Sequence, residues 1–154
     1  MVRRQFARWA GIYREYPRQF WILILGSFID HLGNALIYPF LTLYVSKRFS
    51  VGMTEVGLVF GLFAISSIAG SAGGGAMTDR LGRKGVLVFG LVGSAVTTLG
   101  MGLASSLELF LLSTVFVGLL GNTGGPAQQA MVADLLPPEK RAQGFGVLRV
   151  MANL

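Results

Sequence analysis

The chain has 154 residues, of which 53% are hydrophobic and only 13% charged, and its mean hydropathy is +0.62. An ordinary soluble domain is about a quarter charged, so this composition predicts a membrane protein. The net charge of +6 lies in short clusters between apolar runs, which argues against nucleic-acid binding. With no cysteine and one histidine, the sequence excludes disulfides and a thiolate or multi-histidine metal site within it.

Residues 1–19 form a basic segment that we expect to be cytoplasmic, and the first predicted span covers 20–46. Three polar residues within this span, Asp30, Asn34 and Tyr38, are spaced by four and therefore lie on one side of a helix. A charged group at this depth is costly and usually faces the bundle interior or a water-filled cavity. Asp30 is therefore either a structural partner of neighbouring polar groups or a residue that binds a proton or cation.

Further apolar runs at 56–78, 85–107 and 109–136 are each long enough to cross a bilayer, which takes about 20 residues. A fifth run over 142–154 reaches the last residue without a terminating signal, so we expect an incomplete chain. Its bundle, 20–154, would contain four full spans and part of a fifth.

Glycine pairs with small-xxx-small spacing in the second span, Gly57 with Gly61 and Gly70 with Gly74, predict close helix packing.

Polar residues in the later spans are candidates for substrate contacts. Asn122 and Gln128 are predicted to line a cavity from the fourth span. Arg149 is the only cation inside a predicted span, and it either extends to the membrane surface or pairs with an intramembrane acid.

The basic residues alternate between the two sides of the membrane. Five arginines lie in the first segment, and further basic residues lie in the second-to-third and fourth-to-fifth connections. The opposite side holds only Lys47 and Arg48. Because cytoplasmic loops carry the excess of basic residues, the amino terminus is predicted to be cytoplasmic in a multi-pass protein of the cell inner or plasma membrane.

The connection between the second and third spans, "GGGAMTDRLGRKG" at 73–85, concentrates charge between two apolar runs. Asp79 in a last helical turn and Arg83 in a first turn oppose the helix dipoles, and Asp134 repeats this conflict in the fourth span. The acids are therefore predicted to have cationic partners. A phosphate-binding Walker loop is excluded, because its glycine and Gly-Lys-Ser/Thr spacing does not occur.

Positions 75–84, "GAMTDRLGRK", resemble the signature loop of the major facilitator superfamily, which has the form G-x-x-x-D-R-x-G-R-R/K. The stretch 133–146 is similar to the usual connection between spans four and five of that family. The resemblance implies an all-α transmembrane bundle of the major facilitator type, represented by its N-terminal part. The matching positions, with the acid of span four, are Gly75, Asp79, Arg80, Gly82, Arg83, Lys84 and Asp134.

In the family this loop acts as a cytoplasmic gate. The resemblance implies that Asp79 meets the amino terminus of a helix in the second half, and that Arg83 pairs with Asp79 and with Asp134. Gly75 and Gly82 would permit the tight turn and close helix contact.

The resemblance implies alternating access, and its first expected function is proton-coupled efflux of small organic compounds. Proton-coupled uptake of a sugar or metabolite is the alternative. A non-transporting fragment or assembly partner is a third possibility from another class. One departure is Thr114, which stands where drug and proton antiporters of the family often carry arginine.

No enzyme activity, metal or cofactor is expected, with the proton gradient as energy source. The expected partners are a small-molecule substrate, membrane lipid and the missing C-terminal half of the same protein, but no nucleic acid.

Overall fold

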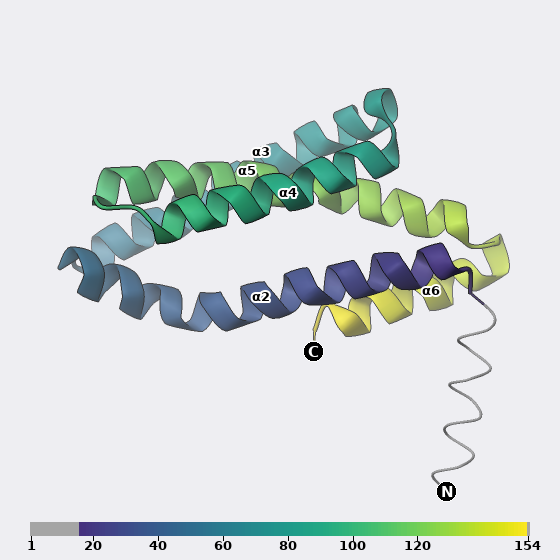
Figure 1. Cartoon of the computed structure of the whole chain (residues 1–154), viewed down its shortest axis with the longest axis horizontal. Helices are drawn as coiled ribbons and strands as arrows, with labels where there is room; N and C mark the ends of the chain where they lie inside the picture. The colour runs from purple at the N-terminus through teal and green to yellow at the C-terminus, as the bar shows by residue number, and fades with distance from the viewer. Residues whose placement is uncertain (1–15, 154) are drawn as a thin grey trace, which may run out of the picture. The chain divides into compact units, whose positions relative to one another are not determined.

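The structure is a computed structural model that describes residues 16–153. Most of the predicted basic segment 1–19 thus lies outside the described residues. The described part is helical and contains no strand, which confirms the predicted all-α class (Figure 1). Its helices are α2 (Arg18–Phe49), α3 (Met53–Leu81), α4 (Arg83–Gly102), α5 (Leu107–Leu135) and α6 (Pro138–Met151).

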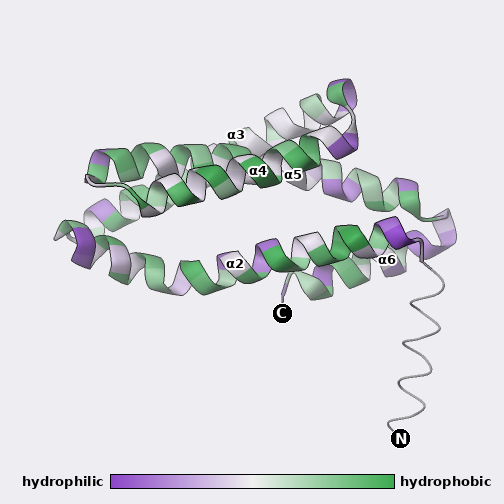
Figure 2. Cartoon of the chain, viewed as in Figure 1, coloured by the Kyte–Doolittle hydropathy of each residue, from purple (hydrophilic) through white to green (hydrophobic). Residues whose placement is uncertain are grey.

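Four of these helices, α2 to α5, are long and apolar enough to cross a membrane. Figure 2 shows hydrophobic residues along most of their length, interrupted by hydrophilic positions at helix ends and within α2 and α5. Large apolar side chains such as Ile65, Ile68 and Leu103 are exposed on the outside of the described helices. In water such a surface would favour aggregation, whereas in a bilayer it faces lipid or further helices.

The helix ends follow from local sequence. Gly82 ends α3 and begins α4 with φ +87° and ψ 146°, a conformation that glycine adopts readily and other residues rarely do. Pro138 occupies the first turn of α6, where its missing N–H and fixed φ are tolerated. Between α4 and α5, the N–H of Ala104 donates to the carbonyl of Met101 at 3.3 Å and closes a tight turn.

The chain divides into two compact units, residues 34–131 and the remaining segments on either side of them. One end of the 34–131 unit is held by side chains. The C-terminal part of α2 and the end of α4 with the turn after it meet the N-terminal parts of α3 and α5 there in one buried group, the apolar cluster. Its members are Leu41, Val45, Val56, Val59, Met101, Ala104 and Phe110.

Elsewhere in this unit α3, α4 and α5 also approach one another through their backbones. A Cβ placed on Gly70 would overlap the backbone of Leu119, and one on Gly74 would lie 2.7 Å from Cα of Thr123. These contacts, with the corresponding ones between α4 and α5, form the glycine interface. Its glycines are Gly70 and Gly74 of α3, Gly90 of α4, and Gly118 and Gly124 of α5.

The close helix packing predicted from the glycine spacing is confirmed for Gly70 and Gly74. Within the described residues, a Cβ at Gly57 or Gly61 would meet no atom within 4 Å. The glycine interface places α5 directly against both α3 and α4, because Gly124 is also close to α4. A Cβ on Gly90 would lie 2.9 Å from the backbone nitrogen of Gly124.

The other unit joins the start of α2 to α6. Phe20 is fully buried, and its Cε2 would lie 3.5 Å from a Cβ on Gly144. The Tyr16 ring stacks on Phe20 with centroids 4.8 Å apart, and its hydroxyl donates a hydrogen bond of 3.2 Å to Oε1 of Gln143. The packing of Phe20 against Gly144 and one long-range hydrogen bond therefore hold the start of α2 to α6.

Candidate functional site

The signature loop lies at the joint between α3 and α4. Asp79 and Arg80 are exposed in the last turn of α3, and Arg83 and Lys84 are exposed in the first turn of α4. The positive φ at position 82 requires glycine there. Gly75 lies inside α3, and a Cβ there would meet no atom within 4 Å among the described residues. Its role in close helix contact stays a prediction.

Arg83 extends from the first turn of α4 to α5. Its Nη1 donates a hydrogen bond of 3.0 Å to the backbone carbonyl of Ala130. Sequence reasoning had not identified this partner, since a backbone carbonyl carries no sequence signal. Asp134 follows Ala130 by one turn of the same helix, and the pairing of Arg83 with Asp79 and Asp134 remains a prediction.

The polar residues predicted on the first span lie on α2. Asp30 is half-buried, and Asn34 and Tyr38 follow at intervals of four residues. Next to Asp30, the Nδ1 of His31 lies 2.8 Å from the backbone carbonyl oxygen of Ser27, within hydrogen-bonding distance.

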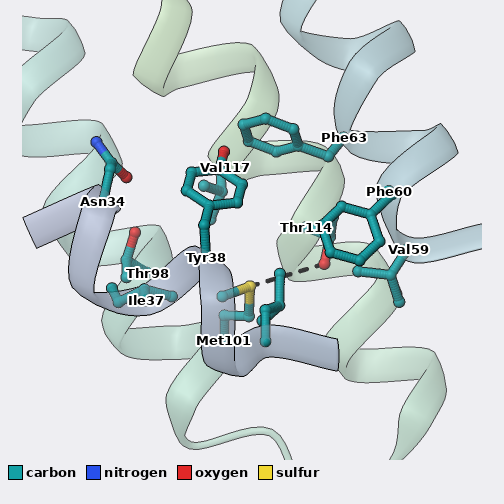
Figure 3. Close-up of a pocket in the computed structure, with 11 residues that line it drawn as sticks. Asn34, Ile37, Tyr38, Val59, Phe60, Phe63, Thr98, Met101, Thr114 and Val117 are labelled. Atoms are coloured by element: carbon teal, nitrogen blue, oxygen red, sulfur yellow. Dashed lines mark hydrogen bonds between the residues drawn. The ribbon is translucent and has the colours of Figure 1, made fainter. Parts of the chain in front are cut away.

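Asn34 and Tyr38 are two of the side chains around a pocket inside the 34–131 unit (Figure 3). All four long helices contribute to its wall. The Tyr38 ring meets the Phe63 ring edge to face, with centroids 5.6 Å apart and planes at 70°. None of the eleven lining side chains is charged. They are Asn34, Ile37, Tyr38, Leu41, Val59, Phe60, Phe63, Thr98, Met101, Thr114 and Val117.

The most deeply buried polar group of this pocket is Thr114 of α5. Only 2% of its surface is exposed. Its hydroxyl is within hydrogen-bonding distance of the Phe110 carbonyl oxygen, at 2.9 Å, and of the Met101 sulfur, at 3.7 Å, which is the dashed line in Figure 3. The position that departs from the pattern implied by the resemblance thus holds a small neutral group in this pocket.

The remaining candidate residues lie elsewhere. Asn122 links α5 to α3, because its Nδ2 donates to Oγ of Ser67 at 3.0 Å and to the Gly118 carbonyl at 3.1 Å. Gln128 is half-buried on α5 and Arg149 is exposed on α6. These three side chains are not among those that line the pocket.

Pocket residues that sequence reasoning missed come mainly from α3 and α4: Phe60, Phe63, Thr98 and Met101. The sequence contains only a weak indication that these residues line a pocket. Thr98 and Met101 share a helix face by their spacing of three, but an uncharged apolar run does not show which face meets another helix. Across residues 16–153, no three His, Asp or Glu side chains are grouped so that they could hold a metal ion.

Comparison with known proteins agrees with the signature loop. The family model of the Major Facilitator Superfamily matches residues 23–154. A protein described as a Na(+), Li(+), K(+)/H(+) antiporter, from Planococcus maritimus, is 30% identical over 146 residues, which are 92% of this chain and 34% of that protein. The quinolone resistance protein NorA of Staphylococcus aureus is 27% identical over 136 residues, 88% of this chain and 35% of NorA.

The chain thus spans about a third of the length of these curated relatives. It belongs to the Major Facilitator Superfamily, whose members are transporters rather than enzymes, and it is a multi-pass membrane protein.

Proposed function

We propose that this chain provides the first helices of a proton-coupled exporter of small organic compounds that works by alternating access. The observation that carries the proposal is the uncharged pocket among α2, α3, α4 and α5, whose wall combines aromatic rings, a thioether and a few hydroxyl and amide groups. This mixture is typical of sites for small organic molecules.

The pocket favours an organic substrate over an inorganic cation. A dehydrated cation needs several oxygen ligands, usually including carboxylates or carbonyls, to replace its water. The pocket offers only the side-chain oxygens of Asn34, Tyr38, Thr98 and Thr114, and the Thr114 hydroxyl is already within bonding distance of Phe110 and Met101. Of the two relatives, the one named for quinolone resistance therefore gives the better guide to substrate class.

Asp30 is the proposed proton-binding residue. It is an acid within a membrane-spanning helix, and it precedes two pocket residues, Asn34 and Tyr38, by one and two turns of α2. The transporter would need no cofactor, because the proton gradient supplies the energy. Its other partners would be membrane lipid and a second helical half of the same protein, and it would not bind nucleic acid.

The proposed setting is the cell inner or plasma membrane, with the amino terminus in the cytoplasm. The basic residues support this orientation: Arg80, Arg83 and Lys84 lie at the helix ends that meet between α3 and α4, and Lys140 and Arg141 lie at the start of α6, on the same predicted side.

Transport by everted membrane vesicles tests the proposal. Vesicles that contain the full-length product of the gene should take up a fluorescent quinolone when a proton gradient is imposed, and an ionophore that dissipates the gradient should stop the uptake. The Asp30→Asn variant should abolish this uptake, since asparagine keeps the size of the side chain but cannot be protonated and deprotonated.

Ser46→Ala, a change near the other end of α2, is the matched control and should transport normally. Quinolone uptake by the Asp30→Asn variant with the pH profile of the unmodified protein would remove Asp30 from the coupling mechanism. Uptake that persists without a gradient would contradict proton coupling itself.

A further inference from the structure

We infer that the Met101 side chain is a movable part of the pocket wall, positioned by its contact with Thr114. This pair sets the size of the aromatic group that a transported compound can place in the pocket. The inference rests on the proposed function for its link to transport. The pocket itself lies entirely within the 34–131 unit, so its occupancy can be measured without transport.

The pocket is small and has aromatic walls. A volume of about 30 Å³ is open to the centre of a water molecule. Since one water needs about 10–15 Å³ by this measure, the pocket has room for about two waters. Tyr38, Phe60 and Phe63 form its aromatic part, and Tyr38 is 37% exposed, so the pocket is accessible beside that ring. An aromatic ring that fills this enclosed part of the pocket therefore requires one lining side chain to move.

Met101 is the side chain best suited to move. It is 9% exposed and lies at the end of α4, where it belongs to both the pocket and the apolar cluster. Methionine is unbranched, has three rotatable side-chain bonds, and makes favourable contacts between sulfur and ring edges. The neighbouring wall residue Val59 is 1% exposed, and its branched side chain has little rotational freedom.

Thr114 contacts Met101 through its hydroxyl, which lies 3.7 Å from the methionine sulfur and shares its single proton between that weak acceptor and a backbone carbonyl. The same hydroxyl lies 2.9 Å from the Phe110 carbonyl, which is also the ordinary backbone acceptor for the Thr114 N–H in a helix. Removing the hydroxyl thus leaves no backbone group without a partner. Thr114 is a positioning residue that acts through Met101.

The fitting ligand is an uncharged aromatic group. The ring of the ligand would lie against Phe63 and Tyr38 and next to the thioether of Met101. Asn34 and Thr98 offer hydrogen bonds to one polar substituent of the ligand. A formal charge would have no opposite charge among the eleven lining side chains and would lose its hydration.

The absence of cysteine from the chain allows a direct measurement of occupancy. Thr98→Cys places one thiol in the pocket wall, with any cysteine elsewhere in the gene product replaced by serine. The rate at which N-ethylmaleimide modifies this thiol is measured in membranes with phenol or with the larger 1-naphthol as probe. Val96→Cys, at a 62% exposed position outside the pocket lining, is the matched control thiol.

We expect phenol to protect the Thr98→Cys thiol at lower concentrations than 1-naphthol relative to the Val96→Cys control. Adding Thr114→Val or Met101→Ala should lower the half-protecting concentration of 1-naphthol about three- to tenfold, the range expected from one modest hydrogen bond or contact. Thr114→Ser, which keeps the hydroxyl, should behave as threonine does. A purely structural role for Thr114 would lower stability without changing the ratio between the two probes.

Two results would overturn the inference: no protection by either probe, or the same 1-naphthol protection with and without Met101→Ala. Met101→Ala creates space without altering Thr114, so a Thr114→Val variant that fails to fold does not remove the test. If the protection pattern is as expected but the vesicles do not transport the quinolone, the proposed function fails and the size-limiting role of Met101 stands.

Discussion

The apolar cluster and the glycine interface hold helices together by different means, the first joining α2, α3, α4 and α5 and the second only α3, α4 and α5. In the apolar cluster, side chains such as Val45, Val59 and Phe110 fill the space between helices. In the glycine interface the backbones themselves meet, and a Cβ on Gly118 would lie 2.9 Å from the carbonyl of Phe63. Side chains can repack around a new shape, whereas two backbones in contact can only move apart.

This difference bears on how the unit can move. In lipid, apolar side chains gain little by leaving the solvent, so close van der Waals packing between helices provides much of the association. The glycine interface supplies such packing for α3, α4 and α5. In contrast, α2 contributes Leu41 and Val45 to the apolar cluster and none of the glycines of the interface. We therefore expect α3, α4 and α5 to separate from one another less readily than α2 separates from them.

The largest effect is expected at the glycine interface. Gly74→Ala adds one methyl group that overlaps the Thr123 backbone, so α3 and α5 must separate, and we expect the free energy of unfolding to fall by about 3 kcal/mol. Thermal denaturation of the purified protein in detergent measures the loss.

Gly73→Ala is the matched control for this substitution. A Cβ at that neighbouring position meets no atom within 4 Å among the described residues, and alanine favours helix. Its stability should be unchanged or slightly increased. Equal losses in the two variants would show that backbone contact does not decide the stability of this region.

A smaller effect is expected where glycine is needed for its conformation rather than for contact. A Cβ on Gly82 would meet no atom within 4 Å in the described structure, yet its φ of +87° is unfavourable for alanine. We expect Gly82→Ala to cost about 2 kcal/mol from backbone strain alone. Gly85→Ala, three residues later inside α4, has the same open space without the positive φ and should cost nothing. A neutral Gly82→Ala variant would mean that the joint between α3 and α4 changes conformation readily.

The sequence predicted those features of the fold that depend on local residue patterns. The apolar runs marked the long helices, the spacing of Gly70 and Gly74 marked a close contact, and the signature loop marked the joint at Gly82. Each of these features depends on consecutive or regularly spaced residues.

The pocket could be predicted only in part. Asn34 and Tyr38 stood out because polar residues are rare in an apolar span. Met101 and Thr98 did not, because a helix in a bilayer is apolar on its lipid-facing side and on its bundle-facing side alike, so hydrophobicity does not show which face turns inward. Their place in the pocket depends on how α4 packs against α5, which only the structure reveals.

The smallest effect is expected in the apolar cluster, where a change of side-chain shape can be absorbed. Phe110 is fully buried, and its ring centroid lies 5.4 Å from that of Phe49 and 6.0 Å from that of Tyr44. Phe110→Leu loses these ring contacts but keeps most of the apolar volume, so we expect a loss of about 1 kcal/mol in the free energy of unfolding. Phe116→Leu, at a 46% exposed position on the same helix, controls for the change in composition and should have no measurable effect. If Phe110→Leu destabilised the protein as much as the single methyl group of Gly74→Ala, side-chain packing and backbone contact would be equally intolerant of change, and α2 would be held as rigidly as its neighbours.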